Sequence, residues 1–123
     1  MSKFESKFYW SDFLFSFEGR ISRKQFWVNG HLMVILPLML VSSMMDVAFG
    51  YMFADGPVSM AMAILLLWPS IAISVKRWHD RDKSGWWVFI VLVPIIGLIW
   101  ALIEIGFTQG TIGPNRFGKD PLM

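Results

Sequence analysis

The chain has 123 residues, of which 55% are hydrophobic and 16% charged, and it contains no cysteine. Its mean hydropathy of +0.53 exceeds what a small soluble domain can bury, because much of such a domain's surface must face water. The missing thiols exclude disulfides, thiolate catalysis and sulfur-ligated metals. The net charge of +2 is mild, and we interpret its basic clusters as membrane-topology signals rather than as a nucleic-acid surface. Composition therefore predicts a single integral-membrane domain over residues 1–123.

Residues 1–22 interleave aromatic and charged side chains. Phe4, Phe8 and Phe15 keep near-helical spacing, and cations lie beside them. This pattern predicts an amphipathic helix lying in the lipid headgroup region, with a disordered leader as the alternative.

Three stretches without Asp, Glu, Lys or Arg follow: Phe26–Met45, Pro57–Val75 and Trp86–Ile103. At about 1.5 Å of rise per residue, each is about as long as the hydrocarbon core is thick. The predicted fold is an all-α membrane protein with three transmembrane helices, over about residues 23–46, 57–76 and 85–107, followed by a Gly/Pro-rich tail over 108–123.

Helix starts are marked in the sequence. Ser22 and Gln25 form a Ser-x-x-Gln capping box, so the first helix is expected to begin at Arg23. Pro57 suits a first helical turn, and Ser84 is expected to cap the third helix.

Lysine and arginine are distributed unevenly along the chain. Five precede the first predicted span, none lies in the first connection, four lie in the second and two lie in the tail. The positive-inside rule predicts a multi-pass protein with a cytoplasmic N-terminus and second connection, and with the first connection outside.

His31 and Glu104 are the intramembrane polar candidates. On straight helices His31 lies near the cytoplasmic edge and Glu104 near the outer boundary, so the two are not expected to meet. Asp46 has the same predicted depth as Glu104, and we interpret both acids as end-turn residues without function. His79 and Asp80 lack the further ligands that a metal-dependent hydrolase needs. We therefore expect no metal, no cofactor and no catalytic residue.

The cytoplasmic connections gather several arginines. We expect Asp80 to pair with Arg77 or Arg81 and to cap the following helix. Arg20, Arg23, Arg77 and Arg81 are expected to share one face, where a basic collar would bind lipid phosphates. The alternative is that these charges only set the orientation.

Three local patterns together resemble the bacterial membrane proteins of the domain of unknown function 805 family. They are Gly19–Trp27 (Gly-Arg-x-Ser-Arg-x-x-Phe-Trp), Arg77–Trp87 (Arg-x-His-Asp…Ser-Gly-Trp-Trp) and Gly113–Pro121. The resemblance implies a bacterial inner-membrane protein and supplies no activity. The candidate residues that these patterns mark are Arg20, Arg23, Arg77, His79, Asp80, Arg81, Ser84 and Trp86, with Asn115, Phe117, Gly118 and Asp120 in the tail.

Three straight spans place the tail pattern outside, away from the other two patterns. A re-entrant turn at Pro94–Gly97 would instead bring all three patterns to the cytoplasmic face. We favour straight spans here, because re-entrant backbone needs shielding by protein and three helices provide little.

The expected function is that of a non-enzymatic accessory or structural protein acting through helix packing and lipid contacts. Small residues four apart, as at Ser59/Ala63, Ser70/Ser74 and Gly97/Ala101, favour a homo-oligomer or another membrane protein as partner. The alternatives are a small oligomeric transporter or channel and a binder of anionic phospholipid headgroups.

Overall fold

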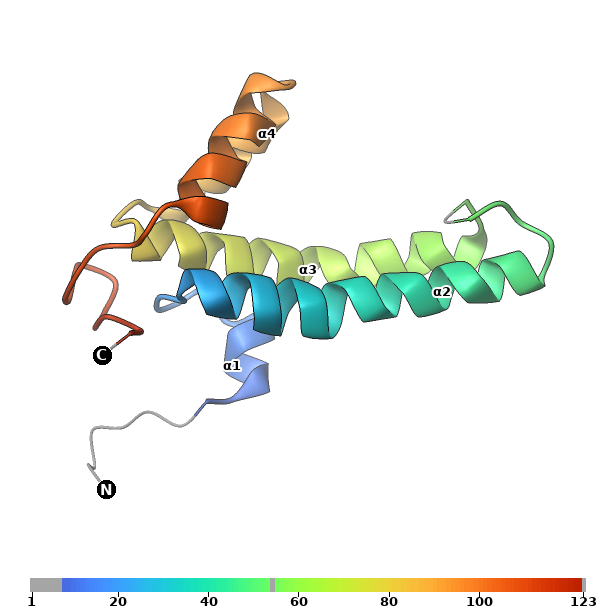
Figure 1. The fold of residues 1–123 in the computed structure, drawn as a ribbon, viewed down its shortest axis with the longest axis horizontal. Coiled ribbons are helices and arrows are strands. Elements are labelled where there is room, and N and C mark those ends of the chain that lie inside the picture. Colours follow the sequence, from blue (N-terminus) through green and yellow to red (C-terminus); the bar gives the residue numbers. More distant parts are fainter. Residues whose placement is uncertain (1–7, 54, 123) are drawn as a thin grey trace.

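The computed structural model describes residues 8–53 and 55–122, and two long antiparallel helices form its axis (Figure 1). The first runs over Gln25–Ala48, with a π-helical stretch η1 (Gln25–Ile35) that continues into α2 (Leu36–Ala48). The second is α3 (Pro57–Asp80). Each has 24 residues and is long and apolar enough to cross a membrane. Only 17% and 33% of their most apolar windows are buried in the protein, unlike the core helices of a soluble domain.

The starts of the first two predicted helices are confirmed. The amide of Ser22 donates to Gln25 Oε1 (2.9 Å), and the amide of Gln25 donates to Ser22 Oγ (3.2 Å), which is the reciprocal pair of a capping box. Helix α3 begins at Pro57 and continues four residues beyond the predicted end at residue 76.

The third apolar segment is not a single helix, so the helix predicted over 85–107 is wrong. A 3₁₀ helix, η2 (Gly85–Leu92), is followed by a reversal and by α4 (Ile96–Ala101), which continues into the π-helical η3 (Leu102–Phe107). The two arms pack so closely that a β-carbon at Gly97 would overlap the carbonyl of Ile90. We call residues 85–107 the hairpin. It leans away from α3 at one end of the helix pair (Figure 1).

A short helix, α1 (Trp10–Phe15), packs against α3 at the same end. The ammonium of Lys76 donates to the carbonyls of Asp12 (2.7 Å) and Phe13 and thereby caps α1. Within residues 8–22, helix covers only these six residues, and residues 1–7 of the predicted headgroup helix lie outside the described residues.

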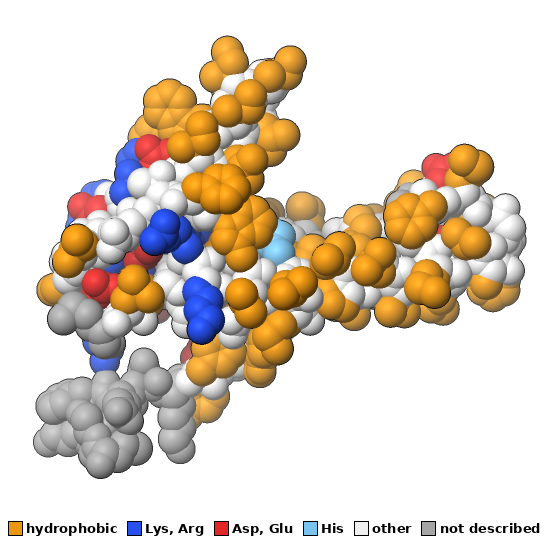
Figure 2. All heavy atoms as spheres, viewed as in Figure 1, with side chains coloured by type: hydrophobic (Ala, Val, Ile, Leu, Met, Phe, Trp, Pro, Cys, Tyr) orange, Lys and Arg blue, Asp and Glu red, His pale blue; other side chains and the backbone are white. Residues whose placement is uncertain are grey.

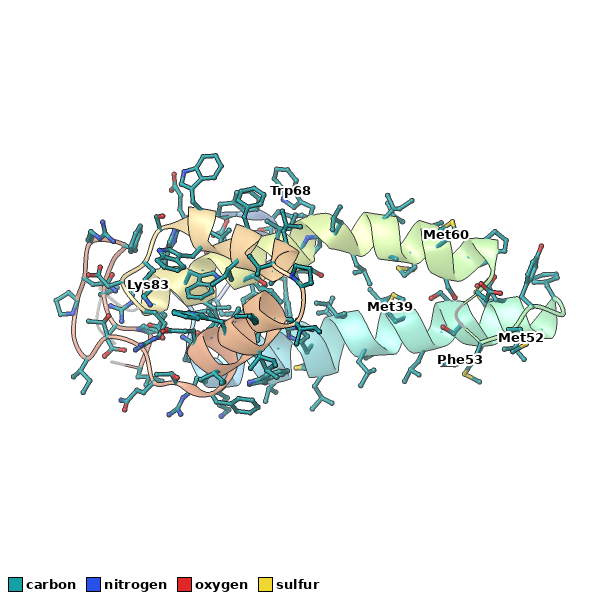
Figure 3. All side chains as sticks on the ribbon, turned by 90° about the horizontal axis from the view of Figure 1, so that it is seen from above. Met39, Met52, Phe53, Met60, Trp68 and Lys83 are labelled. Carbon is teal, nitrogen blue, oxygen red and sulfur yellow. The ribbon has the colours of Figure 1, made fainter. Side chains whose placement is uncertain are left out.

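The apolar core lies where α1, η1, α3 and the hairpin meet. Its buried members are Phe13, Ile21, Phe26, Ile73, Trp78, Ala101 and Ile105. Beyond this core, α2 and α3 pack against each other and carry apolar side chains on their surface (Figure 2). Seen from above, the hairpin overlies one half of the pair, while Met39, Met52 and Met60 lie on the uncovered half (Figure 3).

Candidate functional site: a polar hub at one end of the helix pair

Asp80, the last residue of α3, lies at the centre of a buried charge cluster. Its Oδ1 accepts from Arg20 Nε (3.1 Å) and forms an ion pair with Arg20 Nη2 (2.9 Å). Its Oδ2 accepts from Arg77 Nη1. The arginine side chains are 1% and 0% exposed. One carboxylate therefore bridges two buried guanidinium groups. We call these three side chains, with the carbonyls that they bind, the polar hub.

Arg20 also fastens the tail. Its Nη1 donates to the carbonyls of Gly113 (2.7 Å) and Gly118 (3.2 Å), and its Nη2 donates to that of Thr111 (2.6 Å). Gly113 and Gly118 have φ angles of +80° and +134°, a region that favours glycine, so the tail can present both carbonyls to one guanidinium. Every nitrogen of the Arg20 guanidinium thus has a partner within the protein.

Arg77 fastens the end of the hairpin. Its Nε donates to the carbonyl of Ile105 (2.6 Å), its Nη2 to that of Thr108 (2.7 Å), and its Nη1 reaches that of Ile21 (3.2 Å). The last carbonyls of a helix have no partner inside it. Cations are favoured at that end because the helix dipole is negative there.

Two residues of the opening pattern bind the neighbouring carbonyls of η3. Arg23 Nη1 donates to Phe107 (2.8 Å), and the indole Nε1 of Trp27 donates to Gly106 (2.6 Å). Together with Arg77, these side chains satisfy three successive carbonyls at the end of η3. Residues from two distant sequence patterns therefore form the C-terminal cap of the hairpin.

The tail in turn covers the C-terminal end of α3. Asn115 Nδ2 donates to the carbonyl of His79 (2.9 Å), and the amide of Thr111 donates to that of Asp80 (2.6 Å). The His79 ring stacks on Phe117, with centroids 4.0 Å apart and planes 2° apart, and its Nδ1 lies 2.9 Å from the carbonyl oxygen of Gly19. His79 thus links the opening pattern to the tail.

Asp120 holds the tail in its own compact turn. Its carboxylate accepts from the amides of Leu122 (2.9 Å) and Gly113 (2.9 Å). These two hydrogen bonds, Leu122 first, lower the pKa of the Asp120 carboxyl below its usual value of 3.8. A single antiparallel bridge between Asn115 and Gly118 closes the same turn.

The structure corrects two predictions, the helix cap by Asp80 and the position of Glu104. Asp80 pairs with Arg77, which confirms the predicted pairing with Arg77 or Arg81, and it also pairs with Arg20. It does not cap the next helix, so that prediction is wrong. Arg81 Nε instead pairs with Glu104 (2.9 Å), which also receives Lys83 Nζ (3.1 Å). Glu104 therefore lies at the hub end and not at the far boundary, because the hairpin reverses before reaching it.

Three further predicted site residues form no hydrogen bond with the side chains of the hub. Ser84 occupies the cap position of η2 without making a side-chain capping bond. Trp86 is 77% exposed on the hairpin and packs against Phe89. The Nδ1 atom of His31 lies 2.9 Å from the carbonyl oxygen of Phe26, so His31 is bound within its own helix.

Asp46, at the opposite end of the pair, has a structural role that was not predicted from the sequence. Its side chain is fully buried, not an exposed end-turn acid, and it accepts from the amides of Val58 (3.0 Å) and Ser59 (2.7 Å). These are first-turn amides of α3, so Asp46 on α2 caps the neighbouring helix. A β-carbon at Gly56 would overlap the Asp46 side chain. The sequence does contain a signal for this cap, because an acidic residue in the last turn of one helix precedes a helix that starts at Gly-Pro.

Among residues 8–53 and 55–122, no three His, Cys, Asp or Glu side chains are grouped to hold a metal ion. An apolar groove of about 350 Å³ runs along the outside of the hairpin, lined by Ile96, Ile99, Trp100, Ile103 and Glu104. The side chains of the hub can neutralise the partial charges of helix-terminal carbonyls and fix the orientation of those helix ends.

The hub joins all three sequence patterns at one end of the molecule. The sequence model of the family described as "Protein of unknown function (DUF805)" matches residues 14–119, which contain nearly all of them. The chain belongs to this family. Most polar residues of the DUF805 signature bind one another or the backbone of another signature pattern in this structure.

Curated relatives match over most of their length. "Inner membrane protein YhaH" of Escherichia coli strain K12 is 36% identical, over 85% of this chain and 86% of the relative. "Inner membrane protein YhaI" of the same strain is 35% identical, over 85% of each chain. "Uncharacterized protein YiiR" is 34% identical, over 87% of this chain and 86% of the relative. No solved structure matches the chain.

Proposed function

We propose that this DUF805 chain is a multi-pass inner-membrane protein with a cytoplasmic hub, and that it acts as a non-enzymatic accessory or structural protein. Its means of action are helix packing and lipid contact. The proposal rests on one observation: the polar side chains of the family signature bind other groups of the same protein.

Arg20 and Arg77 illustrate this internal use. Both side chains are at most 1% exposed, and every guanidinium nitrogen has a protein partner. A catalytic group has to reach the reacting atoms of a substrate, directly or through one water. Side chains that are buried and fully hydrogen-bonded suit a structural role instead.

Charge asymmetry supports a cytoplasmic hub. Arg23, Lys24, Arg81 and Lys83 lie at the hub end, whereas Asp46 and Asp55 lie at the other end of the pair. The positive-inside rule assigns the basic end to the cytoplasm. Because the hairpin reverses, the tail lies at that same end (Figure 1).

The uncovered half of α3 offers a surface for packing. Met60, Ile64 and Leu67 are each more than half exposed, and their spacing of four and three residues places them on one helix face. Membrane helices associate through such packing when the shapes fit. We infer that a second copy or another membrane protein covers this face.

Extraction into lipid nanodiscs tests this function. We expect a particle that contains more than one chain, and we expect Met60→Asn with Ile64→Asn to release the single chain. Phe107→Asn, an exposed apolar position on the hairpin, is the matched control and should leave the assembly unchanged. A wild-type particle with one copy of this chain and no other protein would contradict the proposal.

A second candidate function is binding of anionic phospholipid headgroups. Its support is that Lys24 and Arg23 are exposed at the hub end, beside the predicted membrane boundary. Arg20 and Arg77, which the sequence assigned to the same task, already have a protein partner at every guanidinium nitrogen. Binding to phosphatidylglycerol vesicles should fall several-fold in Lys24→Ala relative to Lys119→Ala. Equal binding to anionic and neutral vesicles would remove this candidate.

A further inference from the structure

We propose that the hairpin inserts into the hub-side leaflet alone, with its tip near the bilayer midplane and lipid acyl chains as its partner. This inference rests on the proposed membrane placement of α2 and α3. It adds a membrane element that enters and leaves on one side, which neither the family description nor the names of the relatives state.

Apart from the face that joins the core through Ala101 and Ile105, the surface of the hairpin is apolar all round. No residue of η2 is buried, and Trp86, Leu92 and Ile95 are 77%, 72% and 74% exposed. No Asp, Glu, Lys or Arg occurs between residues 86 and 103. A docked protein would cover one face of such a hairpin, whereas acyl chains surround it, and helices that are apolar on every side belong in an apolar medium.

Three backbone amides at the tip bind carbonyls of the tip itself. The amide of Val93 donates to the carbonyl of Ile90 (3.0 Å), that of Ile96 to Pro94 (2.7 Å), and that of Gly97 to Val93 (3.1 Å). Pro94 has no amide hydrogen. Polar backbone groups without partners are costly in hydrocarbon, so a turn in lipid must bind its own amides. A turn in water is under no such constraint.

Ile95 supplies a second, independent observation. Its φ of 65° and ψ of −64°, with the bond from Ile96 to Pro94 across it, define a classic γ-turn, which is rare and strained. A β-branched residue with positive φ is a marked outlier. Glycine would relieve the strain but would remove an exposed apolar side chain. Retaining isoleucine is understandable where that side chain gains contacts with lipid.

The dimensions and charges of the hairpin suit one leaflet. The arm Ile96–Phe107 has 12 residues and spans about 18 Å, a little over half of the hydrocarbon thickness. Its acid, Glu104, is paired with Arg81 and Lys83 at the base, so the charges remain at the membrane surface. The hub-side leaflet would then hold both hairpin arms beside α2 and α3, and the other leaflet would hold only α2 and α3.

Single-cysteine labelling tests the inference, since the wild-type chain has no cysteine. Ile96→Cys reports the tip, Ile112→Cys the tail, Lys24→Cys the hub side and Met44→Cys the uncovered half of α2. Each variant of the full chain is reconstituted in phosphatidylethanolamine–phosphatidylglycerol vesicles. Depth-dependent quenchers then locate the label, and a membrane-impermeant maleimide locates the exposed side.

We expect the label at residue 96 near the midplane, and residues 24 and 112 reactive from the same side. Reaction of residue 112 from the opposite side would show a straight third span and overturn the inference while leaving the membrane proposal intact. A water-exposed label at residue 96, or cross-linking of residue 96 between two copies, would also overturn it. If the label at residue 44 is in water too, the membrane placement itself fails.

Discussion

At both ends of the α2–α3 pair, charged side chains bind backbone groups at helix termini, but the charges are opposite at the two ends. At the uncovered end one buried acid, Asp46, receives two first-turn amides of α3. At the hub end the arginines Arg23 and Arg77 bind the last carbonyls of η3, and Lys76 binds those of α1. Helix termini leave unpaired backbone groups, positive at the start and negative at the end.

This difference shows why the family signature lies at one end. Amides at a helix start can be capped by one carboxylate, but the hub must close the ends of α3, η3 and the tail together. That task needs several donors with fixed geometry, and the five-donor fork of arginine supplies them. Asp80 then supplies one negative charge that two buried guanidinium groups share.

The largest expected effect is at Asp80. Asp80→Asn leaves two buried guanidinium groups without a counter-charge, and we expect a loss of about 3–5 kcal/mol in the free energy of unfolding. Denaturation in mild detergent, followed by tryptophan fluorescence, measures it. Asp82→Asn, which removes an exposed pair with Arg116, is the control and should change little. Equal stability of the two variants would refute the bridging role of Asp80.

A smaller effect is expected at Asp46. Asp46→Ala removes the cap of α3 and should lower the melting temperature by several degrees, on the order of 5 °C. Asp55→Ala, at an exposed position in the same connection, is the matched control and should leave the melting temperature unchanged. A lower melting temperature in Asp55→Ala alone would mean that Asp55, and not Asp46, caps α3.

The tail should be the part that is sensitive to acid. The pKa of Asp120 is below 3.8 in the folded chain, so its stabilising bonds are fully present above that value and are lost as the pH falls through the folded pKa. As the pH falls below 3.8 and through the lower folded pKa, we expect faster amide exchange at Gly113 and Leu122. Asp120→Asn should show the faster exchange already at neutral pH. Exchange that is independent of pH after correction for intrinsic rates would contradict this.

The smallest effect is expected at Glu104. Its pairs with Arg81 and Lys83 are partly exposed, so Glu104→Gln should cost no more than about 1 kcal/mol, and less in high salt. The same denaturation assay, run at two salt concentrations, measures it. A loss as large as that of Asp80→Asn would show that Glu104 belongs to the core of the hub.

Sequence reasoning predicted what is local. The capping box of Ser22 and Gln25, the start at Pro57 and the first two apolar helices follow from neighbouring residues and appear in the structure. The sequence offers the reversal at Pro94–Gly97 only as the alternative to a straight span, because hydropathy counts apolar residues and does not reveal the positive φ at Ile95.

The partners of the charged residues also escaped prediction. The sequence identified Arg20 and Arg77 as belonging to one face but assigned them to lipid phosphates. Their carbonyl partners are backbone groups up to 98 residues away, which carry no signature of their own. The capping role of Asp46 was not predicted for the same reason, since its partners are also backbone groups, the amides of Val58 and Ser59.

The central claim is that the three signature patterns meet on one side of the membrane. A pair of nitroxide labels at Lys24→Cys and Ile112→Cys, measured by pulsed electron paramagnetic resonance in lipid vesicles, tests it directly. We expect a narrow distance distribution centred well below the hydrocarbon thickness of about 30 Å. A distribution centred at or beyond that thickness would place the tail across the bilayer and contradict it.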